Sequence, residues 1–233
     1  MRLACSSIAQ SPHIVDPEFT KLGAHESPET LRKQIQDKID EAGKKEGYDA
    51  VLLGYGLCGN AALGLRAGSI PLVIPRAHDC CTIFLGGKSR FIELFKDNLS
   101  AEWSSAGYME RSESYLRETD TGRMLGLDKS YDELVEQYGE ENARYIWETI
   151  HPEPHGKELI FIEIPETSHL GYLHRMEELA GEEGKQVRVL DGDMRLIRNL
   201  VCGDWNTEDF LVVPPGCKIR AVYDHEKIIT AGD

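Results

Sequence analysis

The feature that most constrains this chain is an alternation of short apolar runs with amphipathic stretches. Six runs are predicted to be buried strands, at residues 2–5, 50–55, 71–75, 159–164, 187–190 and 210–213, with a seventh, edge strand at 218–223. Several runs are continuous, as in Leu72-Val73-Ile74, which is typical of strands covered on both faces. Helical stretches lie between the strands. The sequence therefore predicts an α/β protein with a mostly parallel, Rossmann-like sheet of about six or seven strands.

The helices are predicted from start signals and apolar spacing. Ser27 and Pro28 are typical of an N-cap and a first helical position. One apolar stripe follows, formed by Leu31, Ile35 and Ile39. Further helices are predicted at residues 60–67, 89–96, 130–150, 171–180 and 194–200. With helices between successive strands, both faces of the sheet are expected to be covered.

The length suits a single domain. With 233 residues, 41% of them hydrophobic, the whole chain (1–233) has enough apolar material for one large core. Residues 98–155 are expected to form a helical insertion or lid segment within that domain. Right-handed crossovers would bring the carboxyl ends of the parallel strands to one edge, where α/β folds bind their ligands.

The charge excludes several classes of partner. Lys and Arg number 26 and Asp and Glu number 40, which gives a net charge of −14. Nucleic acids and anionic membranes both require clustered cations. The chain has no apolar run of about 18 residues for a transmembrane helix, and its start lacks the apolar stretch of a signal peptide. We therefore expect a cytoplasmic protein that binds neither nucleic acid nor membrane.

The six cysteines are the residues best suited to metal binding or catalysis. In a cytoplasm they would be thiols rather than disulfides. No C-x-x-C spacing occurs, which excludes local zinc ribbons and ferredoxin-type cluster motifs. Any shared site must therefore be assembled by the fold. The cysteines are Cys5, Cys58, Cys80, Cys81, Cys202 and Cys217.

The first motif directly follows a predicted strand and fits the dinucleotide fingerprint G-x-G-x-x-G. It consists of Gly54, Tyr55, Gly56, Leu57, Cys58 and Gly59. Dinucleotide binding, which would use Gly54, Tyr55, Gly56 and Gly59, is the less favoured interpretation, because the strand before it is the second and the helix after it is short. Two alternatives are a turn in which glycine lets the backbone pass close to a neighbour, and a turn that exposes Cys58 at the sheet edge.

The second motif follows the third predicted strand and runs Arg76-Ala77-His78-Asp79-Cys80-Cys81. His and Cys are natural zinc ligands, and thiolates also suit iron–sulfur clusters. Asp79 is predicted to orient His78, and Arg76 to lower a thiol pKa or to hold an anionic ligand. The alternative is that His78 caps a turn while both cysteines pack as small apolar residues.

Three predicted strand ends carry these candidate ligands. Cys5 ends the first strand, Cys58 follows the second, and His78 and Cys80 follow the third. In a parallel sheet these ends share one edge, so the four residues are predicted to form a metal site with an open position for substrate. Mixed ligands favour Zn²⁺, and cysteines alone would suit a [4Fe–4S] cluster. His25, in the loop after the first strand, is predicted to reach the same edge as a catalytic residue together with Arg76 and Asp79.

Several of these segments resemble a known family. They are Cys5, His25 and the runs at 48–60 and 71–91. The family comprises uncharacterised proteins of methanogenic archaea and anaerobic bacteria, often encoded near corrinoid-dependent methyltransferases of the methylamine type. The resemblance implies a setting in anaerobic one-carbon metabolism, with a corrinoid or tetrahydrofolate as a candidate substrate. The chain departs from the family pattern at Cys81, where an aliphatic residue is expected, and at Ser6-Ser7, where an acidic residue is common.

Three functions follow from these observations. The first is a metal-dependent enzyme, of methyltransferase type, or an accessory protein of corrinoid-linked methyl transfer. The second is a metal-free enzyme with Cys58 or Cys80 as nucleophile. The third is a non-catalytic partner of a corrinoid protein. The expected partner is accordingly a small-molecule substrate or a corrinoid protein, and a homodimer stays open.

Overall fold

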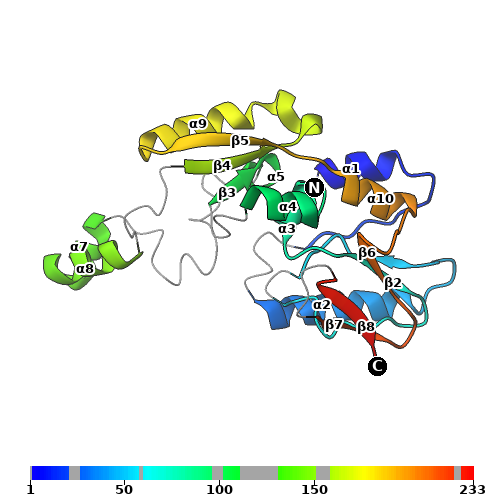
Figure 1. The fold of residues 1–233 in the computed structure, drawn as a ribbon. Coiled ribbons are helices and arrows are strands. Elements are labelled where there is room, and N and C mark those ends of the chain that lie inside the picture. Colours follow the sequence, from blue (N-terminus) through cyan, green and yellow to red (C-terminus); the bar gives the residue numbers. More distant parts are fainter. Residues whose placement is uncertain are drawn as a thin grey trace. The chain divides into compact units, whose positions relative to one another are not determined.

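The computed structural model describes residues 2–20, 27–57, 60–95, 102–110, 131–150, 158–222 and 227–233. The chain divides into two compact units, each with helices and strands (Figure 1). Unit 1 comprises Met1–Leu99, Ile164–Glu166 and Asp191–Asp233, and unit 2 comprises Ser100–Glu163 and Thr167–Leu190. The α/β class predicted from the sequence is confirmed.

Unit 1 contains a three-stranded sheet in the order β1 (Val51–Leu52), β2 (Leu72–Pro75), β6 (Phe210–Val213). β1 runs parallel to β2, and β6 runs antiparallel to it. All four residues of β2 are buried, as the continuous apolar run predicts for a strand with neighbours on both sides. The carboxyl ends of β1 and β2 therefore lie at the same edge of this sheet.

Helices of unit 1 pack on this sheet and on each other. The apolar stripe of α2 (Pro28–Ala42) is buried as predicted, in a core that also contains Leu65 and Leu72. Two short helices, α3 (Cys80–Phe84) and α4 (Lys88–Phe95), follow β2. α10 (Arg195–Cys202) packs against β2 and against α1 (Arg2–Ala9).

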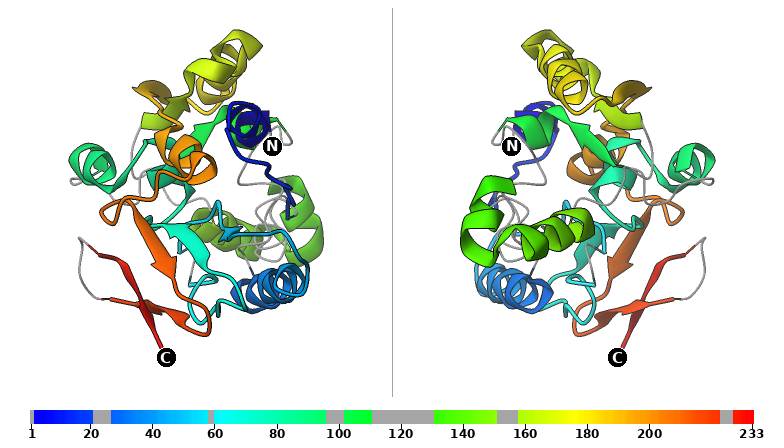
Figure 2. Two further views of the ribbon diagram at one scale, coloured as in Figure 1. Left: turned by 90° about the vertical axis from the view of Figure 1, so that its right-hand side faces the viewer. Right: turned by 90° about the vertical axis from the view of Figure 1, so that its left-hand side faces the viewer.

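The last two strands of unit 1 along the chain, β7 (Lys218–Ala221) and β8 (Ile229–Gly232), form an antiparallel hairpin (Figure 2, red). β7 corresponds to the predicted edge strand, whereas β8 was not predicted. The backbone before β2 also contacts this hairpin, since Gly64 N–H donates to the Ile219 carbonyl at 2.9 Å. Residues 60–64 are consequently turns and Arg66 forms an isolated antiparallel bridge with Lys218, so the helix predicted at 60–67 is not observed.

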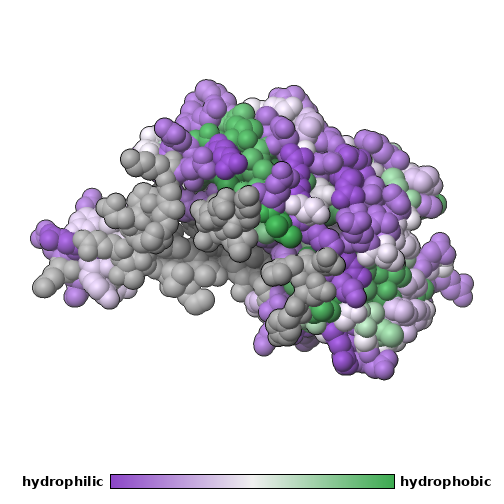
Figure 3. Space-filling view, viewed as in Figure 1, coloured by the Kyte–Doolittle hydropathy of each residue, from purple (hydrophilic) through white to green (hydrophobic). Residues whose placement is uncertain are grey.

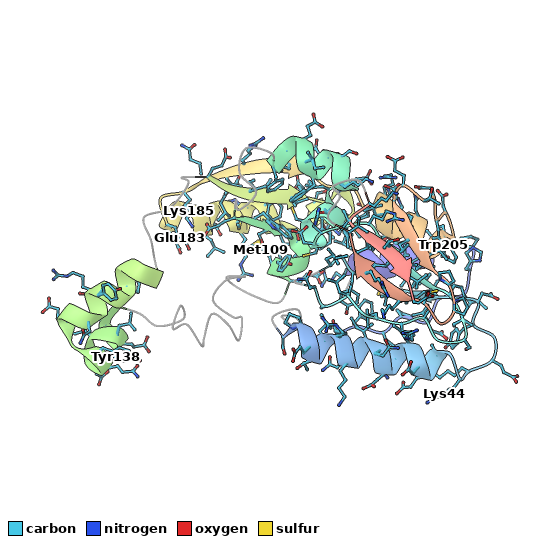
Figure 4. The ribbon with its side chains drawn as sticks, turned by 60° about the horizontal axis from the view of Figure 1, so that its bottom comes forward. Lys44, Met109, Tyr138, Glu183, Lys185 and Trp205 are labelled. Atoms are coloured by element: carbon cyan, nitrogen blue, oxygen red, sulfur yellow. The ribbon has the colours of Figure 1, made fainter. Side chains whose placement is uncertain are left out.

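Unit 2 contains a second three-stranded sheet in the order β3 (Trp103–Ser105), β4 (Glu158–Glu163), β5 (Gln186–Asp191). β3 runs parallel to β4. α5 (Ala106–Met109) and α9 (Tyr172–Glu182) contribute Met109 and Met176 to a core with Leu159 and Phe161, while η2 (Pro165–Leu170) precedes α9. Between α9 and β5, Lys185 pairs with Glu183 at 3.0 Å (Figure 4).

The helix predicted at 130–150 is interrupted. Gly139, with φ +79°, separates α7 (Tyr131–Tyr138) from α8 (Glu140–Ile150). The two helices pack together through an edge-to-face contact of Tyr131 and Trp147, with ring centroids 5.8 Å apart. This helical pair lies within the predicted insertion (98–155), as do β3 and α5.

Two fold predictions are corrected. Residues 2–5 were expected to be the first strand but belong to helix α1, which buries one face through Leu3 and Ser7, four residues apart. The single sheet of six or seven strands is also not observed: the described strands form two three-stranded sheets and one hairpin, and β6 is antiparallel.

The surface of the described residues is mainly hydrophilic in the view of Figure 3, with small hydrophobic areas between charged side chains. Over the parts of the chain that the structure describes, no helix has the length and apolar character needed to span a membrane.

Candidate functional site

The loops that follow β1 and β2 touch through their backbones. Leu57 N–H donates to the Ala77 carbonyl at 2.9 Å. A Cβ atom added to Gly56 would lie 2.8 Å from the Asp79 nitrogen and 2.9 Å from its Cα, which is closer than real Cβ contacts allow. Only glycine fits there, and the interpretation of the motif as a turn that permits close backbone approach is confirmed. The two loops that carry the predicted ligands are therefore neighbours.

Cys58 and Gly59 lie outside the described residues, but the chain on either side of them is held. Leu57 is fixed to Ala77, as above. Asn60 has φ +71°, a left-handed conformation that non-glycine residues rarely adopt. Arg32 on α2 donates from Nη2 to the Asn60 carbonyl at 2.8 Å and from Nε to the next carbonyl at 3.4 Å. Sequence reasoning missed Arg32, because nothing distinguishes it from the other charged residues of 28–42.

The other residues of the glycine motif have structural contacts. The Tyr55 hydroxyl is hydrogen-bonded to the Thr20 hydroxyl at 2.7 Å, and its ring packs against the core of unit 1. Gly54 is exposed, and a Cβ atom there would meet only Ile197 Cδ1, at 3.9 Å. Their predicted cofactor-binding role stays a prediction. His25, which was also predicted to be a catalytic residue, lies outside the described residues.

Asp79 organises the turn that carries His78 and Cys80. Its Oδ1 accepts hydrogen bonds from the backbone N–H of Thr82 at 2.9 Å and from the Thr82 hydroxyl at 3.0 Å. Asp79 is thus the N-cap of α3. Among the described residues, these carboxylate bonds run to Thr82 and not to His78, which sequence reasoning had proposed as the partner. His78 is exposed and Cys80 is half-buried.

The two adjacent cysteines have opposite environments. Cys80 is the first residue of α3 and is partly exposed, whereas Cys81 has no exposed surface. Burial raises the pKa of the Cys81 thiol, with smaller contributions from Asp79 and Cys80. Cys81 is therefore a packed, protonated core thiol.

Arg76 is occupied by backbone carbonyls. Nε donates to Thr207 O at 3.0 Å and to Phe210 O at 3.2 Å. Nη1 donates to Lys227 O at 2.7 Å and also to Ile229 O. Burial lowers the pKa of this guanidinium. These contacts hold the loop after β2 against β6 and β8, so the observed role of Arg76 is structural. Its predicted catalytic role stays a prediction.

Cys5 lies on an exposed position of α1 and not at the end of a strand. The reason given for placing it at the same edge as Cys58 is therefore wrong, and its role as a ligand stays a prediction. Cys202 ends α10, and Cys217 packs against the core of unit 1. Within the described ranges no three His, Cys, Asp or Glu side chains come together as a metal site would require, and both Cys58 and His25 fall outside those ranges.

A second polar cluster in unit 1 surrounds the start of α10. Arg198 pairs with Glu166 at 2.9 Å and with Asp193 at 2.7 Å. Arg195 forms a two-point pair with Asp209, where burial would raise the pKa of that carboxyl but hydrogen bonds from Arg195 and Asn206 hold it below its ordinary value. Asp193 Oδ1 also accepts a hydrogen bond from the backbone N–H of Arg195 at 2.8 Å. Because these carboxylates are paired with arginines, we interpret the cluster as structural.

Comparison with known proteins places the chain in a family. Residues 19–201 match the family described as protein of unknown function (DUF1638). The chain belongs to this family. The match includes both loops of the candidate site and excludes Cys5, β6 and the C-terminal hairpin. No curated protein and no solved structure is significantly similar to the chain.

Proposed function

We propose that this protein is a metal-dependent enzyme or accessory protein whose metal is held by Cys58, His78 and Cys80. The observation that supports this proposal is the contact of the Gly56 backbone with Asp79, because it makes neighbours of the two loops that carry these residues. Cys5 is left out of this set, because it lies at an exposed position of helix α1 and not at the end of a strand.

The donor set suits a transition metal. A half-buried thiol and an exposed imidazole lie two residues apart on a turn that a capped helix fixes. With a second thiol from Cys58, three N/S ligands would suit zinc with one open position. Thiolates alone would suit a [4Fe–4S] cluster instead, with Cys202 as a further ligand. A bound zinc would act as a Lewis acid that activates a thiol or a water molecule.

The reaction class rests on the resemblance and not on geometry. The proposed setting is cytoplasmic, anaerobic one-carbon metabolism, with methyl transfer that involves a thiol, a tetrahydrofolate or a corrinoid, either free or bound to a partner protein. Within this chain, the contribution of the described residues is to present His78 and Cys80 from a rigid turn beside the glycine loop.

Metal analysis of protein purified without oxygen tests the proposal. We expect about one equivalent of zinc, or the iron of one cluster, and its loss in Cys58→Ser and Cys80→Ser. Cys217→Ser is the matched control, because Cys217 is also a half-buried free thiol but packs in the β6–β7 turn. Less than about a tenth of an equivalent of zinc or iron in the wild-type protein, or metal unchanged in Cys58→Ser, would contradict the proposal.

A second function is favoured by the difference between the adjacent cysteines. Because Cys80 is partly exposed beside an exposed His78 while Cys81 is buried, Cys80 is the residue of this pair placed to act as a nucleophile without metal. Alkylation of metal-free protein at neutral pH separates the two functions. A single fast-reacting thiol at Cys80 would favour the nucleophile, and uniformly slow thiols would oppose it.

A further inference from the structure

One side chain fixes the turn between the two candidate ligands His78 and Cys80. Asp79 Oδ1 accepts both the backbone N–H and the hydroxyl of Thr82, at 2.9 and 3.0 Å. Thr82 is fully buried and Asp79 is half-buried, so these bonds are partly shielded from water. The Asp79 backbone is extended (φ −154°, ψ −177°), as an N-cap requires.

The loop after β1 also contacts Asp79, at Gly56. Gly56 leaves no space for a Cβ atom beside the Asp79 nitrogen and Cα, and Leu57 N–H is bonded to the Ala77 carbonyl. The backbone from Ala77 to Asp79 is therefore bounded on one side by the loop after β1 and on the other by the first turn of α3. Asp79 is the residue at which both constraints meet.

We propose that Asp79 is a positioning residue of the candidate site: by capping α3 and seating against Gly56, it sets the directions from which His78 and Cys80 meet a ligand, and it is neither a metal ligand nor a proton acceptor itself. This inference deepens the proposed function and rests on it for the identity of the ligand. Both observed bonds need only an oxygen acceptor, which an amide side chain also supplies.

The test compares Asp79→Asn with Asp79→Ala. Asparagine is as good an N-cap as aspartate, whereas alanine cannot cap. We expect Asp79→Asn to keep the wild-type metal content, and to keep the Cys80 alkylation rate by iodoacetamide and the hydrogen exchange of the Thr82 amide within about twofold. For Asp79→Ala we expect about 5-fold to 30-fold faster exchange, the loss that one or two kcal/mol of a cap produces, with a changed alkylation rate and less bound metal.

Thr82→Val is a second variant that keeps the proposal testable if Asp79→Ala does not fold. It is nearly isosteric, keeps the backbone N–H bond and removes only the hydroxyl bond, so it should shift exchange and alkylation in the direction of Asp79→Ala by a smaller factor. Loss of metal in Asp79→Asn equal to that in Asp79→Ala would overturn the proposal, because the carboxylate would then be a ligand. Wild-type exchange and alkylation in Asp79→Ala would also overturn it.

The readouts distinguish this inference from the proposed function. Exchange and alkylation are measured on metal-free protein and report the turn alone. If wild-type protein binds no metal while Asp79→Ala still changes the alkylation of Cys80 and Asp79→Asn does not, the metal proposal fails and the positioning role stands. If metal binds but Asp79→Ala changes nothing, the positioning role fails and the metal proposal stands.

Discussion

Two regions of unit 1 were predicted to form the same secondary structure, and the structure shows different ones. Residues 2–5 and residues 71–75 were both predicted to be buried strands, the first ending in the candidate ligand Cys5 and the second followed by His78 and Cys80. The second became β2, with β1 on one side and β6 on the other, and every residue buried. The first became α1, which buries only Leu3 and Ser7 and exposes Cys5. A short apolar run is a strand only where neighbouring strands accept its backbone hydrogen bonds, whereas a helix satisfies its own.

The difference extends to chemistry. After β2, the chain is fixed by Arg76 to β6 and β8, by Gly56 to the neighbouring loop and by Asp79 to α3, so Cys80 occupies a defined position. Cys5 is exposed on the surface of α1. The comparison therefore predicts that substitutions in the β2 region have large and specific effects, and that equivalent substitutions in α1 have small ones.

The largest expected difference is in core packing. Leu72→Ala in β2 should lower the free energy of unfolding by about 2 to 5 kcal/mol, because Leu72 has no exposed surface and its loss leaves a cavity. Leu3→Ala in α1 should cost less, since Leu3 keeps 7% of its surface exposed. Urea denaturation of both variants measures this. Equal costs would show that α1 is packed as deeply as β2.

The next effect concerns the contact between the two loops. Gly56→Ala should destabilise the protein by about 1 to 3 kcal/mol, because its Cβ atom would overlap the Asp79 backbone. Gly54→Ala is the matched control, and we expect a change within about 0.5 kcal/mol because the space beside Gly54 is open. Thermal unfolding followed by circular dichroism compares the pair. A neutral Gly56→Ala would contradict the close approach of the loops.

The buried thiol after β2 predicts a dependence on pH. The folded-state pKa of Cys81 is raised above its ordinary value of 9.0, so its contribution is complete below about pH 9 and is lost as pH rises further. Above that pH the unfolded chain releases the proton first, and the free energy of unfolding falls by up to about 1.4 kcal/mol per pH unit. Cys81→Ala should lack this part of the fall and Cys5→Ser should keep it, as measured by urea denaturation between neutral and alkaline pH.

The smallest expected effect is that of Cys5 itself. Cys5→Ser should change stability by no more than about 0.5 kcal/mol and leave the metal content as in the wild-type protein, because the side chain is exposed on α1. Elemental analysis beside Cys80→Ser makes the comparison. Loss of metal in Cys5→Ser would return Cys5 to the ligand set and show that the two regions act together.

Much of the fold was readable from local patterns. β2, β4, β5 and β6 and helices α2, α4, α9 and α10 lie where apolar runs, spacing and caps predicted them. The errors were the segments whose structure depends on a distant partner. Residues 60–67 did not form the predicted helix because their backbone groups bond to Ile219 and Cys217 of the C-terminal hairpin, far along the chain. β3 is short and polar, with the sequence Trp103-Ser104-Ser105, and β8 ends in Ala231-Gly232, so neither forms a continuous apolar run.

The candidate site also combines features that local sequence indicated with features that depend on distant segments. The sequence by itself indicated that Cys58, His78 and Cys80 follow two strands that run parallel, and it gave a close backbone approach as one interpretation of the glycine motif. Only the tertiary structure decided that Cys81 faces the core, that Arg76 is held by carbonyls of β6 and β8, that Asp79 bonds to Thr82 and that Cys5 lies on a helix. Residue type and spacing specify what a segment is able to do, but burial and hydrogen-bond partners depend on which distant segments pack against it.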